Sequence, residues 1–284
     1  MERTAASRHP LEWAAAHLDA RPMPTEADNR ATSLPAASRI SIADLRDALA
    51  AGYADFLAFR SDVLVLCIIY PLAGCVLWRF ASGYSLPQLM FPLVAGFALV
   101  GPLFATGLYE MSRRHEAGEK VTLVTAFAAF RSPGIGAILA LGACLLAVFA
   151  IWLAAAELIY LATFGPGVPA SFAAFTHDVL FTARGRLMTI IGIDVGFLFA
   201  VVVLCTTVIA FPLLLDRHVS VARAIGASIR AVTTNPREMI AWGAIVAGLL
   251  VLGSLPALVG LIVVVPVLGH ATWHLYRKLM PVSP

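Results

Sequence analysis

Long apolar runs alternate along this chain with shorter stretches that hold most of its charged residues. A helix rises about 1.5 Å per residue, so about 20 apolar residues cross the roughly 30 Å hydrocarbon core of a membrane. Runs of about this length indicate transmembrane helices. The pattern therefore predicts an all-α, polytopic membrane bundle with six transmembrane helices, at residues 62–80, 87–110, 135–163, 187–215, 237–254 and 257–276.

A shared polar cap precedes the first, third and fifth predicted spans. Residues 58–62 read AFRSD, residues 129–133 read AFRSP, and residues 234–236, TNP, stand in the same place before the fifth span. Serine or asparagine accepts a hydrogen bond from a free backbone N–H at a helix start, and proline in the first turn loses no hydrogen bond. We therefore predict three tandem helical hairpins in one membrane domain, residues 39–284, with repeats at about 41–115, 119–216 and 218–280.

Each cap follows a stretch in which one helix face is apolar, and an acidic capping box, Ser41 with Asp44, opens the first stretch. The apolar positions of the three stretches are Ile42, Leu45, Leu49, Tyr53 and Phe56; Val121, Val124, Phe127 and Phe130; and Val221, Ile225, Ile229 and Val232. Cytoplasmic helices of this kind can lie in the membrane interface or pack beneath the bundle. The sequence leaves both alternatives open.

Composition and charge indicate the class of protein and its orientation. The chain is 60% hydrophobic and 13% charged, outside the range of soluble domains, and its net charge of +3 gives little support to a nucleic-acid partner. Seventeen of the 20 Lys and Arg residues fall on one side of the six predicted spans, so both termini are expected in the cytoplasm. Residues 1–38 are rich in Arg, Ala, Ser and Pro and lack a signal-peptide core, which predicts a disordered cytoplasmic tail. The expected partner is the lipid bilayer.

The four cysteines indicate no disulfide framework and no structural zinc site. Cys67, Cys75, Cys144 and Cys205 all lie in apolar runs, and none has the spacing of a metal-ligand pair. We expect small buried apolar side chains at these positions, and no metal or other cofactor.

Three prolines lie toward the cytoplasmic ends of the even-numbered spans, at Pro102, Pro212 and Pro266. Proline inside a membrane helix frees a carbonyl and kinks the axis. Three kinks at one depth would widen a cytoplasmic vestibule, or would simply improve the packing of the helices.

The ends of the even-numbered spans carry a family resemblance. Residues 101–110 read GPLFATGLYE, residues 211–217 read FPLLLDR, and residues 269–277 read GHATWHLYR. Together these strings resemble bacterial predicted integral membrane proteins of domain-of-unknown-function family 2189, with similarity from about Ile40 to Met280. The resemblance implies a bacterial inner-membrane location, and it brings no established activity, cofactor or catalytic residue.

Two acids inside apolar runs form a candidate intramembrane polar site. Asp194 lies about 10 Å below the outer edge of the fourth predicted span, and Glu157 lies about seven residues before the third span ends. A carboxylate at such a depth is costly, and two sharing one site would suit proton or cation handling. In the alternative interpretation Glu157 reaches the surface and Asp194 pairs with Arg184 or Arg186.

His270 and His274 are four residues apart, hence on one face of the sixth predicted span. Two histidines at this spacing can bind a metal ion or haem, but no HExxH motif is present and no acid or cysteine nearby in sequence completes a site. Packing histidines with satisfied hydrogen bonds are the preferred interpretation.

We expect a non-enzymatic integral membrane protein that transports or sequesters a small or lipidic solute. The acid pair, the kinks and the absence of catalytic motifs favour this hypothesis. Two alternatives remain: an accessory or assembly subunit that binds another membrane-protein subunit, and an intramembrane metal- or haem-binding enzyme that uses the two histidines.

Overall fold

A computed structural model of the chain describes residues 37–68, 72, 74–76, 79, 87–256 and 258–281. Every regular element in these residues is a helix, which confirms the all-α prediction. The elements are α3 (Ile42–Cys67), η1 (Pro87–Leu89), α5 (Met90–Leu99), α6 (Gly101–Phe104), α7 (Thr106–Glu116), α8 (Leu123–Ala128), η2 (Ala129–Arg131), α9 (Ile135–Phe164), α10 (Phe172–Phe181), α11 (Ala183–Thr207), α12 (Ala210–Arg217), α13 (Val221–Thr234), α14 (Pro236–Ser254) and α15 (Leu261–Leu279).

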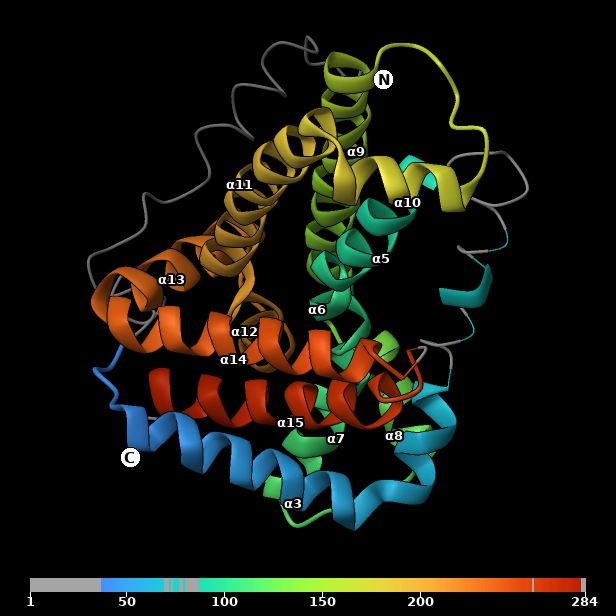
Figure 1. Ribbon diagram of the computed structural model, residues 1–284. Coiled ribbons are helices and arrows are strands. Elements are labelled where there is room, and N and C mark those ends of the chain that lie inside the picture. Colours follow the sequence, from blue (N-terminus) through green and yellow to red (C-terminus); the bar gives the residue numbers. More distant parts are fainter. Residues whose placement is uncertain are drawn as a thin grey trace, which may run out of the picture. The chain divides into compact units, whose positions relative to one another are not determined.

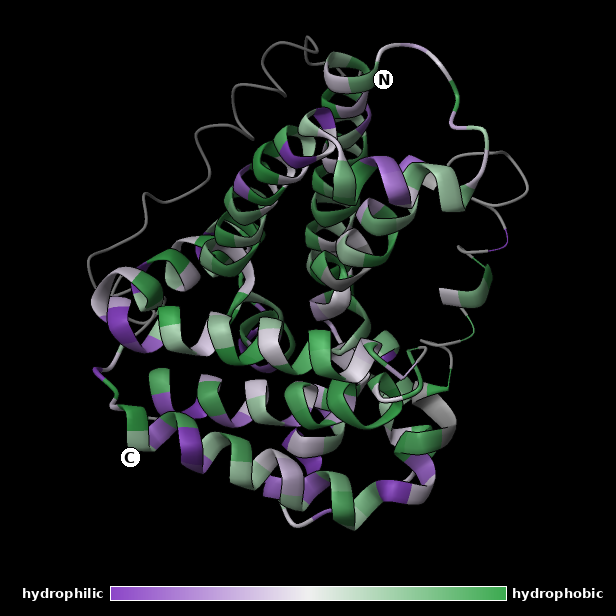
Figure 2. Ribbon diagram, viewed as in Figure 1, coloured by the Kyte–Doolittle hydropathy of each residue, from purple (hydrophilic) through white to green (hydrophobic). Residues whose placement is uncertain are grey.

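In the described residues, three helical segments are long and apolar enough to cross a membrane. They are Ile135–Phe164, Ala183–Arg217 and Pro236–Ser254, and they match the third, fourth and fifth predicted spans. In Figure 2 the ribbons of α9 and α11 are mostly hydrophobic, whereas those of α3 and α15 also carry many hydrophilic positions. Large apolar side chains such as Leu158 and Phe197, each 66% exposed, cover the outside of these segments, as expected of surfaces that face lipid.

The other three predicted spans are not confirmed. The first, 62–80, lies partly outside the described residues. The second, 87–110, is not one continuous helix, because the chain passes through η1, α5, α6 and the start of α7, with interruptions on both sides of Pro102. The sixth corresponds to α15, whose C-terminal half is polar, and α15 is not among the segments apolar enough to span.

A new helix starts at the two predicted caps that contain proline, but not at the one that lacks it. At Pro133, η2 ends at Arg131 and α9 starts at Ile135; at Pro236, α13 ends and α14 begins. The break predicted at Ser61–Asp62 is wrong, because α3 runs unbroken through it and buries Val63. Serine and aspartate keep their backbone N–H groups, so the ladder of hydrogen bonds continues, whereas proline removes one.

Side chains at two predicted caps also differ in outcome. The capping box of Ser41 and Asp44 is confirmed, since each side chain accepts a hydrogen bond from the other residue's backbone N–H. Asn235 does not cap α14. Its Oδ1 instead accepts from the Ile40 N–H and its Nδ2 donates to the Ser38 carbonyl, which attaches the segment before α3 to the end of α13. Residues 1–36 of the predicted tail lie outside the described residues.

The amphipathic stretches bury a different face from the predicted one. In α13 the buried residues are Ala224, Ala227, Ser228 and Ala231, while Ile229 on the predicted apolar face is 41% exposed. In α3, Leu45 and Phe56 are buried as predicted, but Ile42 and Tyr53 are more than half exposed. Small side chains allow the closest approach of two helices, so they decide which face packs.

The most extensive contact between helices joins α3 to α15, which lie side by side in Figure 1. The two helices are antiparallel: Lys278 bonds Asp44 at one end, and Gly52 meets Ala271 near the middle. A Cβ on Gly52 would lie 2.4 Å from the Ala271 nitrogen, well inside van der Waals contact. This glycine therefore sets the separation of the two helices.

Replacing Gly52 with Ala is expected to lower the free energy of unfolding by about 1–3 kcal/mol, the usual cost of overpacking. Thermal unfolding in detergent, followed by intrinsic fluorescence, measures the change. Gly136→Ala is the matched control, because nothing lies within 4 Å of a Cβ there. Equal melting temperatures for the two variants would contradict the close packing of α3 on α15.

Candidate functional site

A buried carboxylate, Asp55, lies where α3, α7 and α15 meet. It is 4% exposed and bonds three side chains: His115 Nδ1 lies 2.9 Å from Oδ1, and His274 Nε2 and Ser112 Oγ lie 2.9 Å and 2.6 Å from Oδ2. Ser112 Oγ is also 2.7 Å from Nδ1 of the fully buried His270. We name Asp55, Ser112, His115, His270 and His274 the Asp55 cluster.

The ionised carboxylate determines how protons are arranged in the Asp55 cluster. A carboxylate only accepts hydrogen bonds, so His115 carries a proton on Nδ1, His274 carries one on Nε2, and Ser112 donates its hydroxyl proton. Because the Ser112 hydroxyl proton is donated to Asp55, Ser112 Oγ can only accept a hydrogen bond from His270. His270 therefore carries a proton on Nδ1. The other ring nitrogen of His270, Nε2, is buried and has no hydrogen-bond partner in the described part of the chain.

Burial by itself raises the pKa of Asp55, but hydrogen bonds from His274, Ser112 and His115 outweigh it and lower the pKa to about 2. Asp55 is therefore ionised throughout the physiological range. Both predicted histidines belong to this cluster, on the face of α15 that packs against α3 and α7. No group of three or more His, Cys, Asp or Glu side chains in the described residues is arranged to hold a metal ion.

The opposite face of α7 carries a second charged group. Glu110, 2% exposed, accepts hydrogen bonds from Arg113 Nε and Nη2 at 2.7 and 2.8 Å and from Arg114 Nε at 2.7 Å. At 100° per residue, these three positions lie on one side of the helix, and Ser112 and His115 lie on the other. The Asp55 cluster therefore sets the rotation of α7 and, with it, the direction of the arginines.

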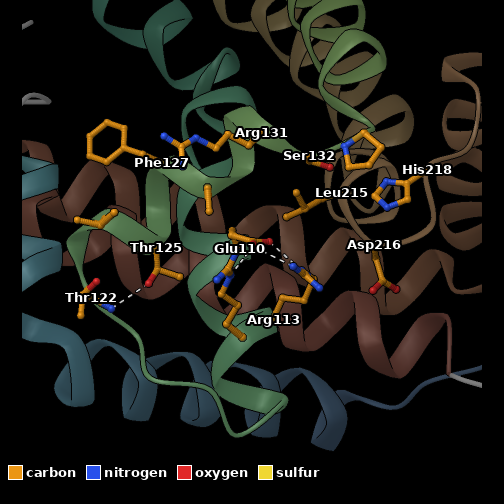
Figure 3. Close-up of a pocket in the computed structure, with 14 residues that line it drawn as sticks. Glu110, Arg113, Thr122, Thr125, Phe127, Arg131, Ser132, Leu215, Asp216 and His218 are labelled. Carbon is orange, nitrogen blue, oxygen red and sulfur yellow. Dashed lines mark hydrogen bonds and ion pairs between the residues drawn. The ribbon is translucent and has the colours of Figure 1, made fainter.

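A cavity of about 510 Å³, which we name the arginine pocket, lies on this arginine face. Figure 3 shows the side chains that line it. It is bounded by α7, α8, the segment from η2 to the start of α9, and the end of α12. Its lining residues are Glu110, Arg113, Arg114, Thr122, Val124, Thr125, Phe127, Ala128, Arg131, Ser132, Pro133, Leu215, Asp216 and His218.

A capping box, a closely packed glycine and a left-handed residue fix the backbone around the arginine pocket. Thr122 and Thr125 form a capping box at the start of α8. Gly134, before α9, packs so tightly that a Cβ would lie 2.4 Å from the Leu214 carbonyl oxygen. His218 ends α12 in the left-handed conformation at φ 48°, which is uncommon for a residue other than glycine.

The arginine pocket has positive charge and N–H donors that are free to bind an anion. It holds three arginines and two acids. Asp216 is engaged elsewhere, by the Tyr276 hydroxyl and by Arg277 and Arg217. Arg131 is exposed and has no ion pair among the described residues. Each arginine has five N–H groups, so Arg113 and Arg114 also keep donors beyond those that Glu110 occupies.

The two predicted intramembrane acids differ in burial and in partners. Glu157 is half-buried on α9 and accepts a hydrogen bond from Gln88 Nε2 at 3.4 Å. Asp194 is exposed on α11. No hydrogen bond or ion pair in the described residues joins these acids, nor Asp194 to Arg184 or Arg186.

The three predicted kink residues have different surroundings. Pro102 and Pro212 each lie in the first turn of a new helix, α6 and α12, just after the preceding helix has stopped. Pro266 lies inside α15, which continues through it. The break before α12 turns the end of that helix toward Gly134 and so contributes to the arginine pocket.

Apart from His270 and His274, the sequence does not single out the residues of the two sites. In the sequence, no local pattern sets Asp55, Ser112 or His115 apart from other polar positions, and the arginines by themselves indicate only topology. One signal was available: Glu110 with Arg113 and Arg114 has the i, i+3 and i, i+4 spacing of helical ion pairs. Nothing local linked Arg131 to that group.

Comparison with known proteins agrees with the membrane assignment. Residues 90–216 match the family described as predicted integral membrane protein (DUF2189), which confirms the resemblance over this part of the chain. Neither the curated proteins nor the solved structures gave a match. The matched range contains α5 to α12 and most of the arginine pocket, whereas Asp55 and His270 lie outside it.

Replacing Asp55 with Asn is expected to lower the free energy of unfolding by about 2–4 kcal/mol, because the amide cannot accept all three hydrogen bonds. The loss should also depend on pH. The folded-state pKa is lowered from 3.8 to about 2, so the ionised Asp55 contributes fully above about pH 4 and loses about 2 kcal/mol as the pH falls toward 2.

Melting temperatures of wild type and variant between pH 3 and 8 measure both effects. Asp47→Asn is the control, because that side chain is 60% exposed and should change stability by less than about 0.5 kcal/mol. A constant difference between wild type and Asp55→Asn down to about pH 4 is expected, with convergence as the pH falls further. An Asp55→Asn protein as stable as the control would mean that the cluster does not hold the three helices.

Proposed function

Residues 90–216 match a family of predicted integral membrane proteins. We propose that the chain is a multi-pass protein of the bacterial inner membrane and that it binds a small anionic or lipidic solute. Binding takes place in the arginine pocket, as the recognition step of transport or sequestration. The observation that carries the proposal is the meeting of Arg113, Arg114 and Arg131, from two separate segments, around one cavity.

Electrostatics favours an anion in the arginine pocket. Glu110 holds two arginines in fixed orientations, so little side-chain freedom is left to lose when they bind a ligand. Arg131 adds a positive charge that no acid in the described residues compensates. The pocket resembles neither a cation site nor an apolar cavity, because its acids are already occupied by arginine and tyrosine partners.

The position of the arginine pocket supports a role at the membrane boundary. The lining residues Arg131, Ser132 and Pro133 are separated by Gly134 alone from Ile135, the first residue of a segment long enough to span. The distribution of Lys and Arg favours the cytoplasmic side for this end and for both termini. A solute from the cytoplasm or from the inner leaflet could then enter the pocket.

The Asp55 cluster supports binding rather than catalysis. Ser112 lies between an aspartate and a histidine, the residue types of a hydrolytic triad, but its side chain is completely buried. A nucleophile must reach its substrate, and this hydroxyl cannot. The cluster instead acts as a positioning device for α7, so the proposal does not include an enzymatic activity.

Replacing Arg131 with Gln is expected to weaken solute binding by about tenfold or more, since a charge-assisted hydrogen bond contributes about 1.5–3 kcal/mol and 1.4 kcal/mol is a factor of ten. Native mass spectrometry of protein gently extracted from its own membrane measures the anionic molecules that stay bound. The wild type should retain one, and Arg131→Gln should lose it.

Arg230→Gln is the matched control, because Arg230 is exposed on α13 and does not line the pocket. It should retain the bound molecule at the wild-type level. Wild-type protein that carries no small anionic molecule, but instead a stoichiometric protein subunit, would contradict the proposal and favour an accessory role in a larger complex.

A further inference from the structure

We infer that the solute of the arginine pocket is a phosphate-bearing lipid, whose phosphate lies among Arg113, Arg114 and Arg131 and whose acyl chain lies along Val124, Phe127 and Phe130. This inference rests on the proposed function and names the class of ligand. It joins two features that lie next to each other: a cavity rich in arginine and an apolar surface that nothing else in the described chain covers.

The apolar surface is formed by α8 and η2. Val124, Phe127 and Phe130 are 75%, 53% and 65% exposed, and the rings of the two phenylalanines are stacked with centroids 6.4 Å apart. These side chains keep helical spacing, so they form one continuous stripe. An exposed aromatic stripe of this kind marks a binding surface for protein or lipid.

The stripe leads directly into the arginine pocket. Val124 and Phe127 line the cavity, and Arg131 follows Phe130 in sequence. In Figure 3 the Arg131 side chain extends toward Phe127, so the cation and the apolar wall lie on the same side of the pocket. A ligand that fits both must carry a negative charge at one end and an apolar chain at the other.

Arginine geometry favours phosphate as the charged end. The planar guanidinium presents paired donors that match phosphate oxygens, and Glu110 already orients two of the three arginines. A zwitterionic headgroup would bring an ammonium group beside these cations. Glu110 cannot compensate for it, since both carboxylate oxygens are occupied. An acidic headgroup without an ammonium group, as in phosphatidic acid or phosphatidylglycerol, is therefore preferred.

The location of the stripe favours lipid over a protein segment. The chain that follows it enters α9 five positions after Phe130, and α9 is a segment of 30 residues with the apolarity of a membrane span. The stripe therefore lies at the depth where the headgroups and upper acyl chains of a leaflet are found. A lipid can reach this pocket by lateral diffusion without leaving the membrane.

Titration of the purified full-length protein in detergent, followed by native mass spectrometry, tests the inference. The probes are dioleoyl phosphatidic acid, dioleoyl phosphatidylglycerol, dioleoyl phosphatidylcholine, dioleoylglycerol and inorganic phosphate. The two acidic lipids should bind at least tenfold more tightly than phosphatidylcholine or dioleoylglycerol, and far more tightly than inorganic phosphate.

Variants separate the two ends of the ligand. Phe127→Ser should weaken binding of phosphatidic acid at least fivefold and leave binding of inorganic phosphate unchanged, whereas Arg131→Gln should weaken both. Phe127→Leu should preserve lipid binding, which separates lost contact from misfolding. Phe197→Ser is the matched control, because Phe197 is a similarly exposed aromatic side chain (66%) on α11, outside the pocket.

The outcomes distinguish the inference from the function on which it rests. If inorganic phosphate bound as tightly as phosphatidic acid, and Phe127→Ser had no effect, the lipid would be ruled out while an anionic solute remained. Equal binding of dioleoylglycerol and phosphatidic acid would rule out the phosphate. If no acidic probe bound at all, or if Arg131→Gln bound every probe normally, the proposed function would fail together with the inference.

Discussion

The tertiary structure depends on the hydrogen bonds that replace water around one buried carboxylate, Asp55. Removing a charge from water costs several kcal/mol unless partners replace the lost hydration. Asp55 obtains three partners, and they come from two other helices, α7 and α15. Because the charge can be compensated only when all three helices are in place, the Asp55 cluster selects one arrangement among the many that apolar packing alone would allow.

Helix α7 transmits this constraint to the arginine pocket. On one face of α7, Ser112 and His115 bond Asp55, and on the other face Glu110, Arg113 and Arg114 line the cavity. A helix is nearly rigid over three turns, so a partner that fixes one face also fixes the other. The pocket can therefore keep its arginines oriented before a ligand arrives, although it lies at the surface. Glu110 completes this arrangement within the helix itself.

Residues close together in sequence made several helix starts predictable, but not all of them. The helix starts at Pro236 and after Pro133 follow from a missing N–H, and the capping box of Ser41 and Asp44 follows from a three-residue spacing. The same cap motif at Ser61 does not stop α3, because without proline the packing of Val63 outweighs it. The candidate sites were less predictable. Asp194 and Glu157 stood out by their apolar surroundings, whereas Asp55 did not.

The sequence by itself determined that the chain is helical and that it has apolar segments long enough to span a membrane. Both depend on the order of residues along a single helix. Only the tertiary structure decided that Asp55 bonds His274, 219 positions away, and that Arg131 shares a cavity with Arg113. The physical reason is that small residues such as Gly52 and Gly134 decide which helix faces meet. Their effect depends on the backbone of the partner, which no local pattern contains.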